Sequence, residues 1–178
     1  MHPGNSYLVL TAVGLDRPGL VNEISALIHD AGANLEDSRM AILGGEFAVI
    51  LLLSGPADTI ERVARARELL EQKTGLRVVL KPTARDQQPR NYLPYTIRVT
   101  GVDRPGIVHS VTQILAGRGV NVASLESRLA YAPLSGTPMF VLEAELQVPS
   151  ELALSQLRRD LSLACEEDNL DFTLESAR

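Results

Sequence analysis

Residues 14–21 read Gly14-Leu15-Asp16-Arg17-Pro18-Gly19-Leu20-Val21, and residues 101–108 repeat them as Gly101-Val102-Asp103-Arg104-Pro105-Gly106-Ile107-Val108. The two stretches are 87 positions apart. The same offset, without a gap, brings further residues into register: Gly32 with Gly119 and Asn34 with Asn121. An internal repeat of this length predicts two copies of one structural unit.

Both copies show the same order of secondary-structure signals. The stretch from Tyr7 to Val13 predicts a strand, and the apolar spacing from Leu20 to Ile28 predicts an amphipathic helix with Pro18 in its first turn. The other predicted elements of the first copy are strands near 34–43 and 46–54, a helix from Pro56 to Gly75, and a strand over 76–81. Those of the second copy are a strand near 95–100, a helix from Pro105, strands from Asn121 and up to Val148, a helix from Ser150, and a strand near 170–174. Each copy is therefore predicted to be a ferredoxin-like βαββαβ unit of the α+β class, an antiparallel sheet with both helices on one face.

A polar stretch separates the copies. Residues 83–93 contain Pro89 and lack hydrophobic periodicity, which predicts a linker. The predicted boundaries are a first domain over 1–83, a linker over 84–93 and a second domain over 94–178. We expect this short linker to favour sheets that lie side by side.

The repeated Asp-Arg-Pro-Gly turn combines groups that suit a small zwitterion. The first N–H groups of a helix have no partner inside the helix and carry partial positive charge, so they bind anions such as carboxylates. Gly19 and Gly106 have no Cβ, which lets a ligand approach their amides. Asp16 and Asp103 add a carboxylate that suits an ammonium group. The alternative is that both aspartates cap their helices, and the two roles can coexist.

The turn, the apolar helix and a following Gly-x-Asn-Leu or Gly-x-Asn-Val resemble the ACT domain, a regulatory module that senses amino acids in many metabolic enzymes. The resemblance implies a ligand held where two domains meet, by the turn of one domain and polar groups of the other. The ligand-binding residues that it implies are Gly14, Asp16, Pro18, Gly19, Leu20 and Asn34 in the first copy and Gly101, Asp103, Pro105, Gly106, Ile107 and Asn121 in the second.

A second stretch, from Asn34 to Phe47, resembles the glycine cleavage repressor family, whose members are stand-alone proteins of two ACT domains. This resemblance implies a regulator without enzymatic activity. It would sense a small amino acid, glycine or serine first, and bind a transcriptional activator protein rather than DNA. Two alternatives stay open: the regulatory portion of a metabolic enzyme such as formyltetrahydrofolate deformylase, and an assembly module that binds no ligand.

Charge and hydropathy argue against several other classes. The net charge of −5 and the pI near 5.2 disfavour direct nucleic-acid binding, and Arg62, Arg65 and Arg67 predict a solvated helix face. No apolar run is long enough to span a bilayer, and the start of the chain does not resemble a secretory signal. We therefore expect no membrane association and a cytoplasmic location. The single cysteine, Cys165, cannot form an intrachain disulfide and predicts a core thiol.

The sequence predicts neither a metal site nor a cofactor. The three histidines show no ligand spacing with one another or with Cys165. Glu143 and Glu145 share one face of a predicted strand, which indicates the wet side of a sheet rather than a catalytic pair.

The two copies differ on the sheet face that the helices leave open. If Leu10, Phe47 and Val49 face the helices, alternation places Val9, Thr11, Val13, Ile50 and Leu52 on the open face. The second copy carries Thr96, Arg98, Thr100, Glu143 and Glu145 there. Monomers rarely expose a large apolar patch, so we predict that the first open face is covered. Its predicted partner is a second copy of the chain in a homodimer, the alternative being the regulated protein.

Overall fold

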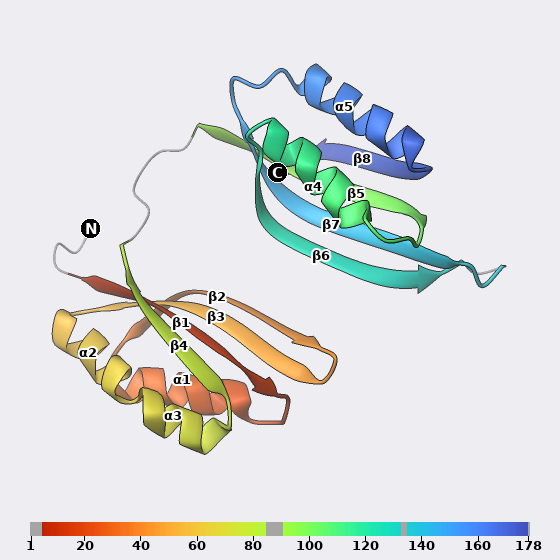
Figure 1. Cartoon of the computed structure of the whole chain (residues 1–178). Coiled ribbons are helices and arrows are strands. Elements are labelled where there is room, and N and C mark those ends of the chain that lie inside the picture. The colour runs from red at the N-terminus through yellow and green to blue at the C-terminus, as the bar shows by residue number, and fades with distance from the viewer. Residues whose placement is uncertain (1–4, 85–90, 133–134, 178) are drawn as a thin grey trace. The chain divides into compact units, whose positions relative to one another are not determined.

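Alternating burial along the strands sets the architecture of each half of the chain. In β1 (Ser6–Leu15), Leu8, Leu10 and Ala12 are buried and the residues between them are partly exposed, as in a sheet covered on one face. The computed structural model describes residues 5–84, 91–132 and 135–177. The chain divides into two compact units, Met1–Gln87 and Gln88–Arg178, and each contains a four-stranded antiparallel sheet with its helices on one face (Figure 1).

The first unit has the strand order β2-β3-β1-β4. Its other elements are α1 (Leu20–Asp30), β2 (Asn34–Leu43), β3 (Glu46–Gly55), α2 (Ala57–Arg65), α3 (Arg67–Thr74) and β4 (Arg77–Thr83). Gly44 and Gly45 join β2 to β3 with φ values of 62° and 85°. Two consecutive left-handed residues are typical of the tight turns that connect antiparallel strands, which explains why both are glycine.

The second unit repeats this arrangement with the order β6-β7-β5-β8. Its elements are β5 (Tyr92–Val102), α4 (Ile107–Gly117), β6 (Asn121–Tyr131), β7 (Pro138–Pro149), α5 (Leu154–Glu167) and β8 (Leu170–Ser176). The ferredoxin-like α+β prediction is thus confirmed for both halves. Residues 85–90 of the predicted linker, and Pro133 and Leu134 in the predicted loop before β7, lie outside the described residues.

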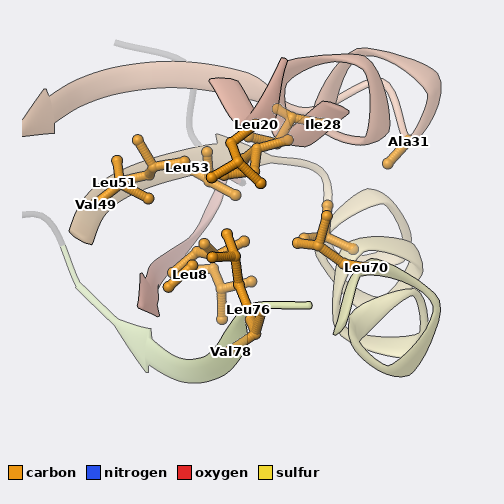
Figure 2. Close-up of a cluster of buried hydrophobic side chains, with 14 of the residues drawn as sticks. Leu8, Leu20, Ile28, Ala31, Val49, Leu51, Leu53, Leu70, Leu76 and Val78 are labelled. Carbon is orange, nitrogen blue, oxygen red and sulfur yellow. The ribbon is translucent and has the colours of Figure 1, made fainter. Parts of the chain in front are cut away.

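Each unit encloses one apolar core between its sheet and its helices. Figure 2 shows the first core, in which Leu20 and Ile28 of α1 and Leu70 of α3 pack over the strand residues Leu8 and Leu53. Leu10, Phe47 and Val49 also lie in this core, so the predicted inward face is correct. The second core contains Cys165, which is free and 3% exposed, and burial raises the pKa of its thiol. The prediction of a core thiol is confirmed.

Four predicted helix boundaries are wrong. The helix expected from Pro105 begins at Ile107, because Gly106 has φ 98° and is not helical. Helix α1 begins at Leu20, so Pro18 lies before it rather than in its first turn, because Gly19 has φ 96° and is not helical. The helix expected from Pro56 to Gly75 is broken at Ala66, whose ψ is 0° and whose amide is shared between the carbonyls of Arg62 and Val63. The helix expected from Ser150 begins at Leu154, since a turn closed by Leu152 N–H and Pro149 O precedes it.

A side chain from the helical layer reaches one outer strand of each sheet. In the first unit, Glu71 of α3 accepts a hydrogen bond from the Val78 amide of β4 at 2.8 Å, and this bond lowers the pKa of the Glu71 carboxyl. In the second unit, Arg158 of α5 donates to the Leu174 carbonyl of β8 at 2.5 Å. At the opposite edge of the first sheet, every residue of β2 is exposed.

Candidate ligand site at the strand-to-helix turns

Gly19 fixes the conformation of the turn between β1 and α1. Its φ of 96° and ψ of −11° are left-handed values that residues with side chains rarely adopt. A proline followed by a glycine with these angles is typical of a type II turn. Gly106 has φ 98° and ψ −11° before α4, so both units use the same turn.

The turn leaves the first amides of each helix without a protein acceptor. In the first unit, the Gly19 carbonyl accepts the first helical hydrogen bond, from Glu23 N–H at 2.9 Å. Within residues 5–84, no acceptor contacts the amides of Leu20, Val21 or Asn22, and no side chain caps the helix. Helix α4 likewise has no side-chain cap among the residues described. The capping alternative is therefore wrong, and both helix starts keep donors available for an anion.

Asp16 and Asp103 lie beside these donors with exposed side chains. The Asp16 amide donates to the Gly45 carbonyl at 3.0 Å, and the Asp103 amide donates to the Pro138 carbonyl at 3.1 Å. These bonds tie each turn to the neighbouring hairpin. In the described part of the chain, no protein donor contacts either carboxylate. Each turn therefore presents free N–H donors together with an unpaired negative charge.

An open groove of about 670 Å³ runs past the first of these turns. Asp16, Pro18, Gly19 and Leu20, four of the predicted residues, line it. The side chain of Leu20 is buried in the core, so Leu20 offers its amide rather than its side chain. The rest of the lining is formed by Arg17, Val21, Asn22, Ser25, Met40, Ile42 and Phe47.

Met40 and Ile42 were not predicted for this site. The Gly44-Gly45 turn folds β2 back along β3, and Met40 pairs with Val49 while Ile42 pairs with Phe47. Because paired residues point to the same side of a sheet, both side chains lie on the helix-covered face beside the start of α1. The sequence signal that could have located them was the alternation along β2, in which residues 40 and 42 point to one face of the sheet and their neighbours point to the other.

Gly14 and Gly101 do not line this groove; they allow close packing. A Cβ on Gly14 would lie 3.1 Å from Leu76 Cδ2 and 3.3 Å from the Gly75 carbonyl oxygen. A Cβ on Gly101 would clash with Leu170 Cδ2 and lie 3.2 Å from the Asn169 carbonyl oxygen. The first strand of each unit needs glycine here because the loop that follows the last helix of the unit crosses it closely.

Asn34 and Asn121 lie away from the turns of their own units. Asn34 begins β2 after α1, whose 11 residues are about 16 Å long. Its side chain donates to Glu36 at 2.9 Å, and that of Asn121 donates to Gln147 at 2.8 Å. Within one unit, a small ligand at the turn does not reach the asparagine.

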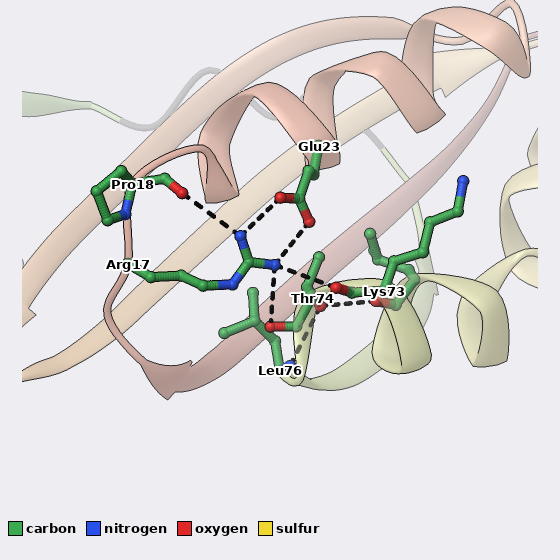
Figure 3. Close-up of polar contacts among 7 residues, drawn as sticks. Arg17, Pro18, Glu23, Lys73, Thr74 and Leu76 are labelled. Carbon is green, nitrogen blue, oxygen red and sulfur yellow. Dashed lines mark hydrogen bonds and ion pairs between the residues drawn. The ribbon is translucent and has the colours of Figure 1, made fainter.

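Arg17, in the middle of the motif, holds the turn in place (Figure 3). Its guanidinium donates to both carboxylate oxygens of Glu23 at 2.6 and 2.8 Å. It also donates to the carbonyls of Lys73 and Thr74, at 3.1 and 3.5 Å, where α3 ends. A cation at a helix C-terminus is favourable because the last carbonyls carry partial negative charge. Arg17 thus connects the start of α1 to the end of α3.

The second unit makes the same connection with a different partner. Ser110 stands where the first unit has Glu23, and Arg104 instead forms an ion pair with Asp168, the residue that follows α5. In both units the arginine of the motif joins the turn to the end of the last helix. This contact explains why both copies of the repeat carry an arginine at the same position of the turn. The explanation does not require the arginine to bind a ligand.

The described residues contain neither a candidate metal site nor a candidate membrane-spanning helix. No group of three or more His, Cys, Asp and Glu side chains is placed to hold a metal ion among them. None of their helices is long and apolar enough to cross a bilayer.

Comparison with known proteins relates both halves to one family. Residues 6–81 and residues 95–161 each match the ACT domain family. Over 163 residues the chain is 31% identical to the glycine cleavage system transcriptional repressor of Escherichia coli strain K12, a match that covers 92% of this chain and 86% of that protein.

Two solved structures agree with the whole fold. A protein of unknown function from Galdieria sulphuraria is 32% identical, with a TM-score of 0.85 over 98% of this chain and 99% of that one. A structure provisionally described as a glycine cleavage system transcriptional repressor is also 32% identical, with a TM-score of 0.74 over 98% of each chain.

The packing role of the two strand glycines can be tested by stability. We expect Gly101→Ala to lower the free energy of unfolding by about 1–3 kcal/mol, because the added methyl overpacks the contact with Leu170. Gly14→Ala should cost less, since its neighbours are farther away. Gly117→Ala is the control, because a Cβ there meets nothing within 4 Å. Urea unfolding followed by circular dichroism measures all three, and equal stabilities for Gly101→Ala and Gly117→Ala would contradict the packing role.

The contact between Arg17 and Glu23 should make stability depend on pH. Hydrogen bonds from Arg17 lower the pKa of the Glu23 carboxyl, so the folded state favours the ionised form. This stabilisation is full above the ordinary carboxyl pKa of about 4.3 and is lost as the pH falls through the lower folded pKa. Glu23→Gln should therefore lower Tm at neutral pH, and its difference from the parent should shrink in acid.

Glu61→Gln is the matched control for this measurement. Glu61 forms an exposed i, i+4 pair with Arg65 at 3.0 Å, and such surface pairs contribute little. A thermal melt at several pH values compares the two variants. A Glu23→Gln effect that stays constant from neutral pH to acid would rule out the ion pair as its source.

Proposed function

Because the chain belongs to the ACT domain family, with one ACT domain in each half, we propose that it is an amino-acid-sensing negative regulator of glycine cleavage genes that acts through a partner protein. The chain is an ACT regulatory protein that resembles the glycine cleavage system transcriptional repressor over most of its length. That relative is a regulator rather than an enzyme, which supports a function without catalysis.

The observation that carries the ligand part of the proposal is the pairing of free amides with a free carboxylate at one turn. The amides of Leu20, Val21 and Asn22 would bind the α-carboxylate of an amino acid, as helix starts bind anions. The carboxylate of Asp16 would bind the α-ammonium group. Both charges of the zwitterion are then matched across one groove.

The groove lining supports a small side chain on the ligand. Met40 and Ile42 bound it on the strand side, and Ser25 and Asn22 supply polar groups on the helix side. Glycine has no side chain that must be accommodated between these residues, and the hydroxyl of serine would meet the side chain of Ser25 or Asn22. These two amino acids are therefore the first ligands to test. The second turn offers the same groups through Asp103, Pro105, Gly106 and Ile107.

Surface charge supports action through a protein, which we propose is a transcriptional activator. The chain carries a net charge of −5. The arginines of α2 and α3 are occupied: Arg62 pairs with Asp58 at 2.7 Å, and Arg65 and Arg67 pair with Glu61 and Glu71. Phosphate binding relies on free lysine and arginine side chains, and this helical surface offers few of them.

Calorimetry against the individual amino acids tests the ligand. We expect glycine or serine to release heat on binding to the parent, and Asp16→Asn to weaken that binding by about tenfold to a hundredfold, since the variant loses a charged hydrogen-bond partner. Gly19 and Gly106 are unsuitable for this test, because their φ values of 96° and 98° strain any side chain.

The control is Asp30→Asn, which removes the same charge from an exposed aspartate at the far end of α1. Asp103→Asn reports in the same way on the second turn, and the stoichiometry shows how many turns are occupied. If no amino acid binds the parent, or if Asp16→Asn and Asp103→Asn both bind like Asp30→Asn, the ligand proposal is wrong.

A gel-shift measurement tests the absence of direct DNA binding. We expect the chain alone to leave duplex DNA unshifted at low salt, where non-specific electrostatic binding is strongest. Addition of the activator protein to the same DNA is the positive arm of this assay. A shift by the chain alone that disappears as salt is added would overturn this part of the proposal.

A further inference from the structure

An apolar cavity, which we call the hollow, lies between α1 and the strands β2 and β3 of the first unit. Its volume is about 90 Å³. Its floor is formed by core side chains that are 7% exposed or less: Ile24, Ile28, Phe47, Val49 and Leu51. Because these side chains are aliphatic or aromatic, the floor offers van der Waals contact rather than hydrogen bonds.

The rim of the hollow exposes apolar side chains to solvent. Val21 of α1 is 53% exposed, and Leu35 and Met40 of β2 are 44% and 54% exposed. Two small polar residues, Ser25 and Ser38, complete the rim. A carbon side chain placed in the hollow would cover the apolar rim and remove it from water, which stabilises the complex.

The hollow adjoins the groove at the first turn. Four residues line both of them: Val21, Ser25, Met40 and Phe47. Val21 and Ser25 are one helical turn apart, which is about 6 Å along α1. The hollow therefore begins within one turn of the free amides at the start of α1. An amino acid whose carboxylate is held by those amides can place its side chain in the hollow.

The volume of the hollow limits the side chain that it can hold. An apolar protein cavity of about 150 Å³ binds benzene, which corresponds to about 25 Å³ for each of its six carbons. On that scale, a cavity of 90 Å³ holds about three or four carbons. The branched side chain of valine has three carbons, whereas that of phenylalanine has seven.

We propose that the first turn selects an aliphatic amino acid of the size of valine, whose side chain occupies the hollow. This inference rests on the proposed function, in which the turn binds the α-carboxylate and the α-ammonium group of an amino acid. Those two charges are common to all α-amino acids, so they do not distinguish one from another. The hollow supplies the distinction, through apolar area that glycine cannot cover.

Ser38 is the residue that leaves room on the strand side of the hollow. It pairs with Leu51, so its side chain lies on the helix-covered face of β2. In the second unit, Leu125 occupies the equivalent position and pairs with the smaller Ala144. Leucine is therefore compatible with the fold here. At position 38, beside the larger Leu51, a leucine side chain would project into the hollow and fill it.

Calorimetry with glycine, valine and phenylalanine tests the selection, in an Asp103→Asn background that weakens the second turn. Valine should bind about tenfold to a hundredfold more tightly than glycine, because each buried carbon contributes a factor of about four. Phenylalanine should bind more weakly than valine, since its ring is larger than the hollow.

Ser38→Leu in the same background tests whether the hollow is responsible. By filling the hollow, it should bring the ratio of the valine affinity to the glycine affinity close to one. The matched control is Ala41→Leu, which adds the same side chain to the opposite face of β2, where Ala41 pairs with Ala48. This control should keep the parental ratio. Circular dichroism and a thermal melt check that both variants are folded.

The outcomes separate this inference from the proposal on which it rests. If glycine binds and valine binds no more tightly, the inference is wrong and the ligand proposal stands. A folded Ser38→Leu variant that keeps the parental ratio would also overturn the inference. If none of the amino acids binds, the ligand proposal and the inference are both wrong.

Discussion

The left-handed conformation of one glycine in each unit governs both the fold and the candidate site. Gly19 and Gly106 turn the chain from the central strand into a helix that lies on the sheet, with φ values of 96° and 98°. The same turn keeps the helix from starting earlier, so its first amides remain unpaired. The local geometry that lets the helix cover the core thus also creates the anion-binding end.

The repeat was sufficient to predict the order of the elements and the inward face of the sheets. Burial of Leu10 and Phe47 follows from alternation alone. Helix boundaries were less predictable: Pro18 is equally acceptable in a first helical turn and in a type II turn, and only the angles of Gly19 decide between them. The break at Ala66 has no sequence signal, since alanine is a good helix former.

The sequence predicted the part of the candidate site that lies close to the turn along the chain, but not the part that depends on how the chain folds back. Residues close to the turn in sequence, such as Asp16 and Gly19, were identified from their chemistry. Met40 reaches the groove only because a hairpin returns it there, and Asn34 is carried away by the length of α1. Gly14 shows that a glycine of a shared motif can serve packing rather than binding.

The hydrogen bonds from the Val78 amide to Glu71 and from Arg158 to the Leu174 carbonyl occupy backbone groups on one outer strand of each sheet. A strand from another molecule that approached β4 or β8 would have to displace a charged side chain from a backbone group. In β2, on the opposite edge of the first sheet, charged side chains also bond to the backbone: Asp37 accepts a hydrogen bond from the Ser38 amide at 2.7 Å, and Arg39 donates to the Ser38 carbonyl at 2.9 Å. Growth into fibrils by repeated strand addition requires strand edges whose backbone groups are available, so these side-chain bonds oppose amyloid-like assembly.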